Sequence, residues 1–152
     1  NPEMVRHARG LLDCASRGAG RDRSAVGVVA GAVTVVDEDG SLARGRARVE
    51  VAMYLDVVAA LDVTVTVPDE VLAPLRAALA AGDDEAAGRC VPDELLDRFA
   101  FAGTPAQVAQ HAAELVAAGA SRIEFGTPHG RTDDHGLDLL GRHVLPALKE
   151  LP

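Results

Sequence analysis

Gly103-Thr104-Pro105, a helical stretch, Gly119 and then Ser121-Arg122-Ile123-Glu124-Phe125-Gly126-Thr127-Pro128-His129-Gly130 form the segment that decides the fold class. Thr104 can cap a helix, Pro105 suits its first position, and Gly119 suits its end. The apolar residues after Gly119 predict a strand that runs into a loop containing Gly, Pro and His. In α/β proteins, loops at the carboxyl ends of strands bind ligands, so we look for function here first.

The chain upstream of this segment also alternates helices and strands. Asn1-Pro2-Glu3 predicts a helix start, and Gly18 and Gly20 predict its end. The valine-rich run from Val26 to Val36 predicts a buried strand with both faces covered, as in a parallel sheet flanked by helices.

The remaining elements follow from apolar spacing and from acidic helix starts. We expect one helix from Leu42 to Leu61 capped by Ser41, and an extended connection at Val63 to Val67. Further expected elements are three short helices starting near Pro68, Asp83 and Pro92, a short strand at Phe99 to Ala102, and a last helix at Asp134 to Leu148 that Pro146 should kink.

This order predicts an α/β fold with about three parallel strands and flanking helices. A complete eight-stranded (β/α)8 barrel needs about 250 residues. A chain of 152 residues can therefore supply only part of such a barrel.

Composition excludes several classes of function. The net charge of −8 and the 3% aromatic content argue against nucleic acid as a partner. The longest apolar run is too short for a membrane helix. No signal peptide opens the chain, and Cys14 and Cys90 form neither a metal motif nor a disulfide framework. We expect a cytoplasmic protein with two structural thiols.

The loop after the last predicted strand holds the candidate ligand site. Thr127, His129 and Arg131 supply polar groups, while Gly126 and Gly130 let backbone amides approach a ligand. Together they can hold a phosphate or a carboxylate. The alternative is a plain turn, with Asp133 or Asp134 capping the last helix. His129, Asp133, Asp134 and His135 match no firm metal signature, so we expect no metal.

Gly103-Thr104 offers a second candidate, because the amides at a helix start can bind an anion. A helix cap explains this pair equally well. His7, His111 and His143 fall within predicted helices, where a surface or partly buried histidine is expected rather than a catalyst.

The chain resembles the bacterial luciferase-like superfamily, most closely its methylenetetrahydromethanopterin reductase branch. The stretches that carry this resemblance, in order, are Asn1-Pro2-Glu3-Met4, Ala19-Gly20-Arg21-Asp22, Phe101-Ala102-Gly103-Thr104-Pro105, Ala118-Gly119-Ala120, Gly126-Thr127-Pro128-His129-Gly130 and Leu139-Leu140-Gly141-Arg142 with Leu145-Pro146. Their order and spacing extend over almost the whole chain.

The resemblance implies that residues 1–152 are the carboxyl-terminal half of a (β/α)8 TIM barrel. The sixth strand would be Val26 to Val36, and the seventh and eighth would lie near Phe99 to Ala102 and Arg122 to Gly126. It implies an oxidoreductase that transfers a hydride between the deazaflavin coenzyme F420 and a small-molecule substrate, or alternatively an FMN-dependent monooxygenase. The implied cofactor-binding residues are Gly126, Thr127, His129, Gly130 and Arg131, with Gly103 and Thr104.

No catalytic residue can be assigned from this half. An isolated half-barrel would expose sheet edges and apolar strand faces. We therefore expect it to pair with a missing amino-terminal half or with a second copy, and to be inactive as a lone monomer. Two other interpretations remain: a non-catalytic half-barrel that serves as an interaction module, and another α/β barrel enzyme that binds a phosphorylated substrate at Thr127 to Arg131.

Overall fold

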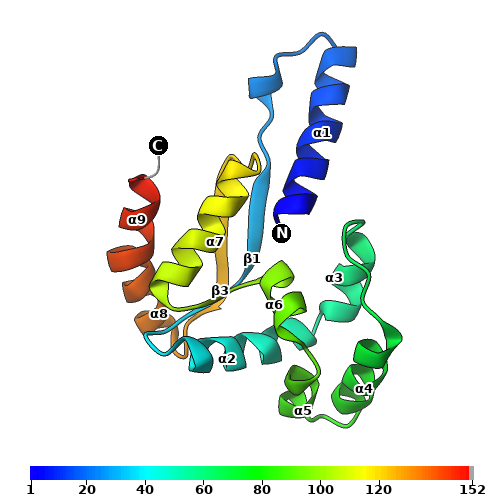
Figure 1. Ribbon diagram of the computed structural model, residues 1–152, viewed down its shortest axis with the longest axis vertical. Coiled ribbons are helices and arrows are strands. Elements are labelled where there is room, and N and C mark those ends of the chain that lie inside the picture. The colour runs from blue at the N-terminus through cyan, green and yellow to red at the C-terminus, as the bar shows by residue number, and fades with distance from the viewer. Residues whose placement is uncertain (151–152) are drawn as a thin grey trace.

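A single three-stranded parallel sheet forms the centre of the molecule, which is seen here in a computed structural model that describes residues 1–150 (Figure 1). The strands are β1 (Val29–Val36), β2 (Ala100–Gly103) and β3 (Arg122–His129). β1 lies in the middle. Its carboxyl half, Val33 to Val36, pairs with β2, whereas β3 accompanies it from Val29 to Val35 with a register shift after Val33. The predicted α/β class with about three parallel strands is confirmed.

The order of the strands differs from the expectation for three successive barrel strands. Such strands would lie in the order β1-β2-β3, but the sheet has the order β2-β1-β3. β2 is only four residues long and pairs with one end of β1, whereas β3 matches the length of β1. After the helical segment that follows β1, the chain returns as β2 to one edge of β1, and β3 pairs with the opposite edge.

Helices surround the sheet in two groups. α2 follows the carboxyl end of β1 and leads to α3 to α6, which lie below and to the right of the sheet in Figure 1, while α7, α8 and α9 lie on its left. In chain order the helices are α1 (Pro2–Gly18), η1 (Arg23–Ala25), α2 (Gly40–Ala52), α3 (Leu55–Leu61), α4 (Asp69–Ala80), α5 (Asp84–Arg89), α6 (Asp93–Phe99), α7 (Pro105–Ala117), α8 (Asp133–Leu139), η2 (Leu140–Val144) and α9 (Leu145–Lys149). Over residues 1–150, no helix has the length and apolar content that a membrane crossing requires.

The two faces of the sheet are covered differently. On one face, the paired residues Ala30 and Ile123, and Ala32 and Phe125, pack in a core with α1, α7, α8 and η2. On the other face, Val33 and Val35 join a second core built from α2 to α6. Both cores are closed around the carboxyl half of β1.

The amino half of the second face is open. Val29 is 54% exposed, and Gly31, Arg122 and Glu124, which share this face, are exposed as well. The prediction that both faces of the valine-rich strand are covered is therefore wrong for this half. Val29 is the one apolar side chain on this open half, beside the charged Arg122 and Glu124, and within residues 1–150 the edge of β1 opposite β3 is unpaired from Val29 to Ala32. An unpaired strand edge is a ready contact for further structure.

The predicted helix from Leu42 to Leu61 is two helices. Asp39, not Ser41, caps the first, because its carboxylate accepts hydrogen bonds from the backbone amides of Ser41 and Leu42. The chain leaves helical geometry at Tyr54 and restarts as α3. No glycine or proline marks this break, which explains why the apolar spacing predicts one helix.

The last predicted helix is also interrupted, here by the π-helical turn η2. Pro146 lacks an N–H to donate to the carbonyl four residues earlier, and its ring needs room there. The predicted disturbance at Pro146 is thus confirmed, although it begins one turn earlier. Thr132 caps α8, so neither Asp133 nor Asp134 serves as the cap.

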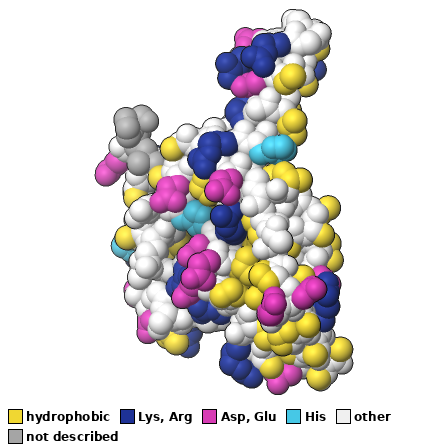
Figure 2. Space-filling model, turned by 45° about the vertical axis from the view of Figure 1, so that its right-hand side comes forward, with side chains coloured by type: hydrophobic (Ala, Val, Ile, Leu, Met, Phe, Trp, Pro, Cys, Tyr) yellow, Lys and Arg dark blue, Asp and Glu magenta, His cyan; other side chains and the backbone are white. Residues whose placement is uncertain are grey.

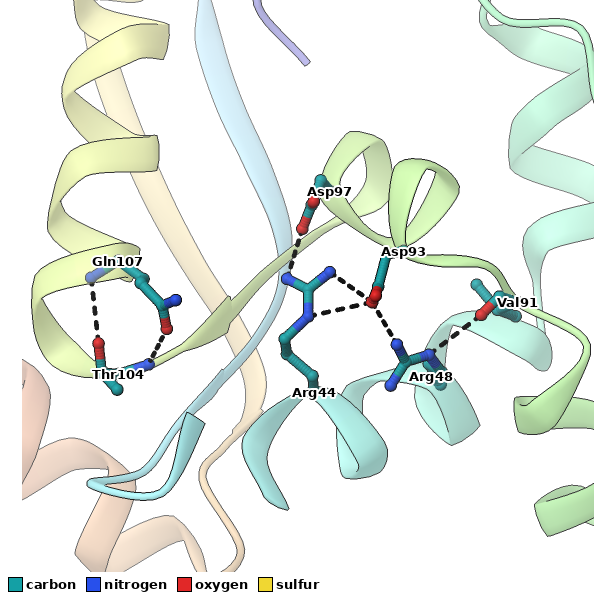
Figure 3. Close-up of polar contacts among 7 residues, drawn as sticks. All are labelled: Arg44, Arg48, Val91, Asp93, Asp97, Thr104 and Gln107. Carbon is teal, nitrogen blue, oxygen red and sulfur yellow. Dashed lines mark hydrogen bonds and ion pairs between the residues drawn. The ribbon is translucent and has the colours of Figure 1, made fainter. Parts of the chain in front are cut away.

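The other predicted helix ends agree with the structure. Asn1 caps α1, and residues 63–67 form a connection without a strand. At α7, Thr104 and Gln107 make a capping box: the Thr104 amide donates to Gln107 Oε1 at 2.8 Å, and the Gln107 amide donates to Thr104 Oγ1 (Figure 3). Cys90 packs at the edge of the second core, but Cys14 is exposed, so a buried structural role is wrong for Cys14.

The capping box should be measurable in the stability of the protein. We predict that Thr104→Ala lowers the free energy of unfolding by about 1 kcal/mol, because the first turn of α7 loses a hydrogen-bond acceptor. Gln110→Ala is the control on the same helix, since Gln110 only contacts the exposed Glu114, and it should change stability by less than about 0.5 kcal/mol. Urea unfolding measures both values. Equal losses would contradict the role of the box.

Candidate functional site

The carboxyl half of β3 and the loop after it hold five of the seven residues predicted to bind a cofactor: Gly126, Thr127 and His129 lie in the strand, and Gly130 and Arg131 follow it. His129 has a positive φ of 73°, and its Nε2 donates a hydrogen bond to the carbonyl of Phe125 at 3.1 Å. Its Nδ1 is buried without a hydrogen-bond partner among the described residues, 3.6 Å from the Asp133 carboxylate. The ring is therefore held by its own strand, and its polar atoms do not line any of the hollows described below.

The glycines of this loop are required by close packing of the backbone. A Cβ atom on Gly126 would lie 2.7 Å from the carbonyl oxygen of Ala32 on β1, and one on Gly130 would lie 2.7 Å from Cα of Gly136 on α8. Real Cβ contacts are longer than this, so larger residues would push β3 and α8 away. Their packing accounts for these glycines whether or not a ligand is bound.

Gly126 and Thr127 line an apolar cavity of about 570 Å³ that borders the sheet, called the main cavity below; the polar hollow beside the start of α1 has the same volume. The cavity lies against the sheet between the start of α1 and helix α3. Its apolar wall includes Met4, Val58, Phe99, Phe101 and Leu115, and the backbone of β1 from Ala30 to Val33 borders it. Asn1, Asp62, Arg98, His111 and Thr127 supply its few polar groups. A mostly apolar hollow with a few polar groups is the usual form of a cofactor or substrate site.

The other predicted residues lie elsewhere. Arg131 lines a second hollow of about 500 Å³ with α2 and α5. Thr104 lines a third, of about 440 Å³, with Glu38 and His143. Gly103 packs against Gln107 of the capping box. The structure thus places Gly126 and Thr127 at the main cavity and separates Arg131 and Thr104 from them.

His111 is a cavity residue that the sequence did not single out. Its ring packs on Phe101 with centroids 5.1 Å apart, in the wall between the main cavity and a polar hollow beside the start of α1. Burial lowers the pKa of the His111 imidazole below its ordinary value, so the ring is neutral at pH 7. The sequence predicted a surface or partly buried helix histidine, and the structure shows partial burial. Contact with a cavity could not be predicted, because it depends on long-range packing.

Three potential metal ligands meet beside the carboxyl end of β1. His135 Nε2 lies 2.9 Å from Glu38 Oε2 and 4.0 Å from Asp37 Oδ2. Asp37 is buried and accepts a hydrogen bond from the backbone amide of Asp39. The sequence grouped His135 with Asp133 and Asp134, whereas the fold brings it to two carboxylates nearly one hundred residues away. A hydrogen bond between His135 Nε2 and Glu38 Oε2 holds two members of this group together.

The sequence matches a known protein family. The profile of the luciferase-like monooxygenase family matches residues 1–122. The chain belongs to this family. The resemblance stated from the sequence motifs is confirmed.

Two of the proteins that this chain is similar to are named as reductases. The chain is 31% identical, over 98% of its length, to 5,10-methylenetetrahydromethanopterin reductase of Archaeoglobus fulgidus. It is 30% identical over 84% of its length to the enzyme of the same name from Methanolobus tindarius. It spans 46% and 40% of these two proteins, less than half of each.

A solved structure shows that the fold is shared. The coenzyme F420 dependent tetrahydromethanopterin reductase from Methanopyrus kandleri superposes with a TM-score of 0.80 at 24% sequence identity. The match covers 97% of this luciferase-like chain and 43% of the reductase chain. The arrangement of the sheet and helices is therefore one that occurs within a larger luciferase-like protein.

The environment of His111 predicts a pH dependence of stability. Because its pKa is lower in the folded chain than in the unfolded chain, the unfolded chain binds the proton more readily below pH 6.5. His111 should therefore destabilise the fold increasingly as the pH falls from 7 to 5, and should have no such effect above pH 7. We expect His111→Gln to reduce this loss of stability.

Urea unfolding at pH 8, 6.5 and 5 tests this expectation. His7→Gln is the matched control, because His7 is an exposed helical histidine. The free energy of unfolding of the His7 variant should follow the wild type at each pH. An equal change of the pH dependence in both variants would contradict this role of His111.

Proposed function

We propose that this chain is the carboxyl-terminal part of an oxidoreductase that transfers a hydride between coenzyme F420 and a small organic substrate. The observation that carries this proposal is the 31% identity to a 5,10-methylenetetrahydromethanopterin reductase over 98% of the chain. Because the chain spans less than half of that relative, the activity is proposed for a protein in which the rest of the barrel is present.

The choice of F420 over FMN rests on the reductase relatives. The solved relative is described as coenzyme F420 dependent, and it shares the fold across 97% of this chain. The main cavity suits a flat ring system, since small residues of β1 border it and aromatic side chains form part of its wall. The bound deazaflavin would supply the hydride chemistry, and the protein would position the ring and exclude water.

Several residues of this chain have definite tasks in the proposal. Gly31 leaves space on the sheet beside the ring, and Phe101 supports His111 in the cavity wall. Thr127 offers a hydroxyl at the end of β3. Neutral His111 can donate or accept one hydrogen bond toward a ligand. Arg131 and Thr104 line other hollows, so we assign them no contact with the ring.

The open half of the sheet supports the proposal of a larger barrel. β2 pairs only with Val33 to Val36, which leaves the amino half of β1 without a partner on that edge, and Val29 is 54% exposed there. We propose that a further strand pairs with this free edge, supplied by an amino-terminal half or by a second copy of the chain. Backbone pairing at the edge and burial of Val29 would favour this assembly.

Cofactor titration tests the proposed function. The protein, with any further segment that it naturally carries, is titrated with F420 and separately with FMN, and ligand fluorescence is followed. We expect saturable binding of F420 and at least tenfold weaker binding of FMN. Binding of FMN alone would favour the monooxygenase alternative, and binding of neither cofactor would contradict the oxidoreductase proposal.

A cavity variant links the binding to this site. Gly31→Val adds a β-branched side chain at the border of the cavity, where its Cβ would lie 3.2 Å from the Cβ of the exposed Glu124, which must give way slightly. The variant should weaken F420 binding at least tenfold. Thr66→Val is the control, because Thr66 is exposed on the connection before α4. Unchanged F420 affinity in a folded Gly31 variant would place the ligand elsewhere.

A further inference from the structure

A groove rich in arginine lies apart from the main cavity. It is a hollow of about 500 Å³ between α2, α5 and the loop after β3. Four arginines line it: Arg46 and Arg48 from α2, Arg89 from α5, and Arg131 from the loop. Glu85 is the only acidic side chain among its lining residues. We call these residues the arginine groove. This gathering of positive charge is notable in a chain with a net charge of −8.

Two of the four arginines are fixed by the protein. Arg48 donates to the carbonyl of Val91 at 3.0 Å and to the Asp93 carboxylate, and Asp93 is shared with Arg44 (Figure 3). Arg46 pairs with Glu50 on the same helix. A guanidinium has five N–H donors, so Arg48 keeps donors for a ligand after making these two hydrogen bonds.

The other two arginines have no ion pair within residues 1–150. Arg89 ends α5 and Arg131 lies in the loop after β3, and both side chains are exposed at the groove. They come from elements far apart in sequence, and they are brought to α2 by the packing of α5 and by the path of β3. On the face that Figure 2 shows, basic side chains mostly lie beside acidic ones. At the groove, Glu85 is among the lining residues and Asp39 lies near Arg131, so these carboxylates oppose a bound anion while Arg89 and Arg131 attract it.

The floor of the groove is left open by a glycine. Gly45 lies between Arg44 and Arg46 on α2, and a Cβ atom there would have no other atom within 4 Å. Glycine inside a helix costs about 1 kcal/mol relative to alanine, and here no steric contact requires it. Gly88 has the opposite environment, since a Cβ there would lie 3.0 Å from the Val49 side chain, so Gly88 lets α5 approach α2.

We propose that the arginine groove binds an anion that bears phosphate or carboxylate groups. The planar guanidinium matches both groups with two parallel hydrogen bonds, and several such forks can hold one oxyanion. The fixed Arg48 would position the anion, while Arg89 and Arg131 would close over it. Glu85 opposes this binding by charge repulsion. The site is independent of the proposed oxidoreductase function, because it shares no lining residue with the main cavity.

Anion-dependent stability of the complete protein tests the site. The thermal midpoint is measured with increasing sodium phosphate or sodium citrate, at ionic strength held constant with sodium chloride. A ligand that binds only the folded state raises this midpoint in proportion to its affinity. We expect a saturable rise with at least one of the two anions. A rise with phosphate alone identifies a phosphoryl ligand, and a rise with citrate alone identifies a polycarboxylate.

Variants separate the groove from general charge effects. The double variant Arg89→Gln, Arg131→Gln should weaken the anion response at least tenfold. Arg17→Gln, Arg21→Gln is the control, because it removes the same charge from exposed positions on and just after α1. Glu85→Gln should strengthen the response about threefold or more.

Gly45→Glu provides a test that does not depend on the loss of an arginine. The new side chain has space, and it places a carboxylate among the arginines. It should abolish the anion response while the midpoint without anion stays equal or rises. The proposal is overturned if neither anion raises the midpoint, or if the control double variant loses as much response as the groove variant. F420 binding should be unchanged in all these variants, so this outcome is separate from the test of the proposed function.

Discussion

The pairing of β1 on both edges is the constraint on which the rest of the structure depends. Val33 to Val36 bond to β2 on one edge and β3 runs along the other, so this half of β1 cannot move without breaking both ladders. The two hydrophobic cores meet on opposite faces of the same residues. Toward Val29, β1 has no pairing with β2, and the face that α2 to α6 cover farther along is open. The main cavity begins where this support ends.

Much of the fold could be predicted from local signals. Asn1, Thr104 and Pro105 mark helix starts through backbone chemistry that does not depend on the rest of the chain, and the structure confirms them. The strand order could not be predicted, because the position of β2 depends on how the α2–α6 excursion packs. The break at Tyr54 could not be predicted either, because no glycine or proline lies there to signal it.

The candidate site was harder to predict than the fold. A sequence stretch from Gly126 to Arg131 suggests one site, but successive residues of a strand and loop point in different directions. Thr127 borders the cavity, His129 bonds to its own strand, and Arg131 enters the arginine groove. Residues brought in from α1, α3 and α7 complete the cavity. The apolar hollow beside the sheet and the arginine groove therefore draw their residues from different elements, and no single stretch of sequence marks either of them.

Backbone hydrogen exchange tests most directly whether half of this sheet is open. In the 152-residue chain, the amides of Val29 to Ala32 should exchange at least tenfold faster than those of Val33 to Val36, because β2 pairs only with the second group and helices α2 to α6 cover only that group. In an assembly that supplies the missing strands, the first group should become equally protected. Equal protection of both groups in the 152-residue monomer would contradict the account.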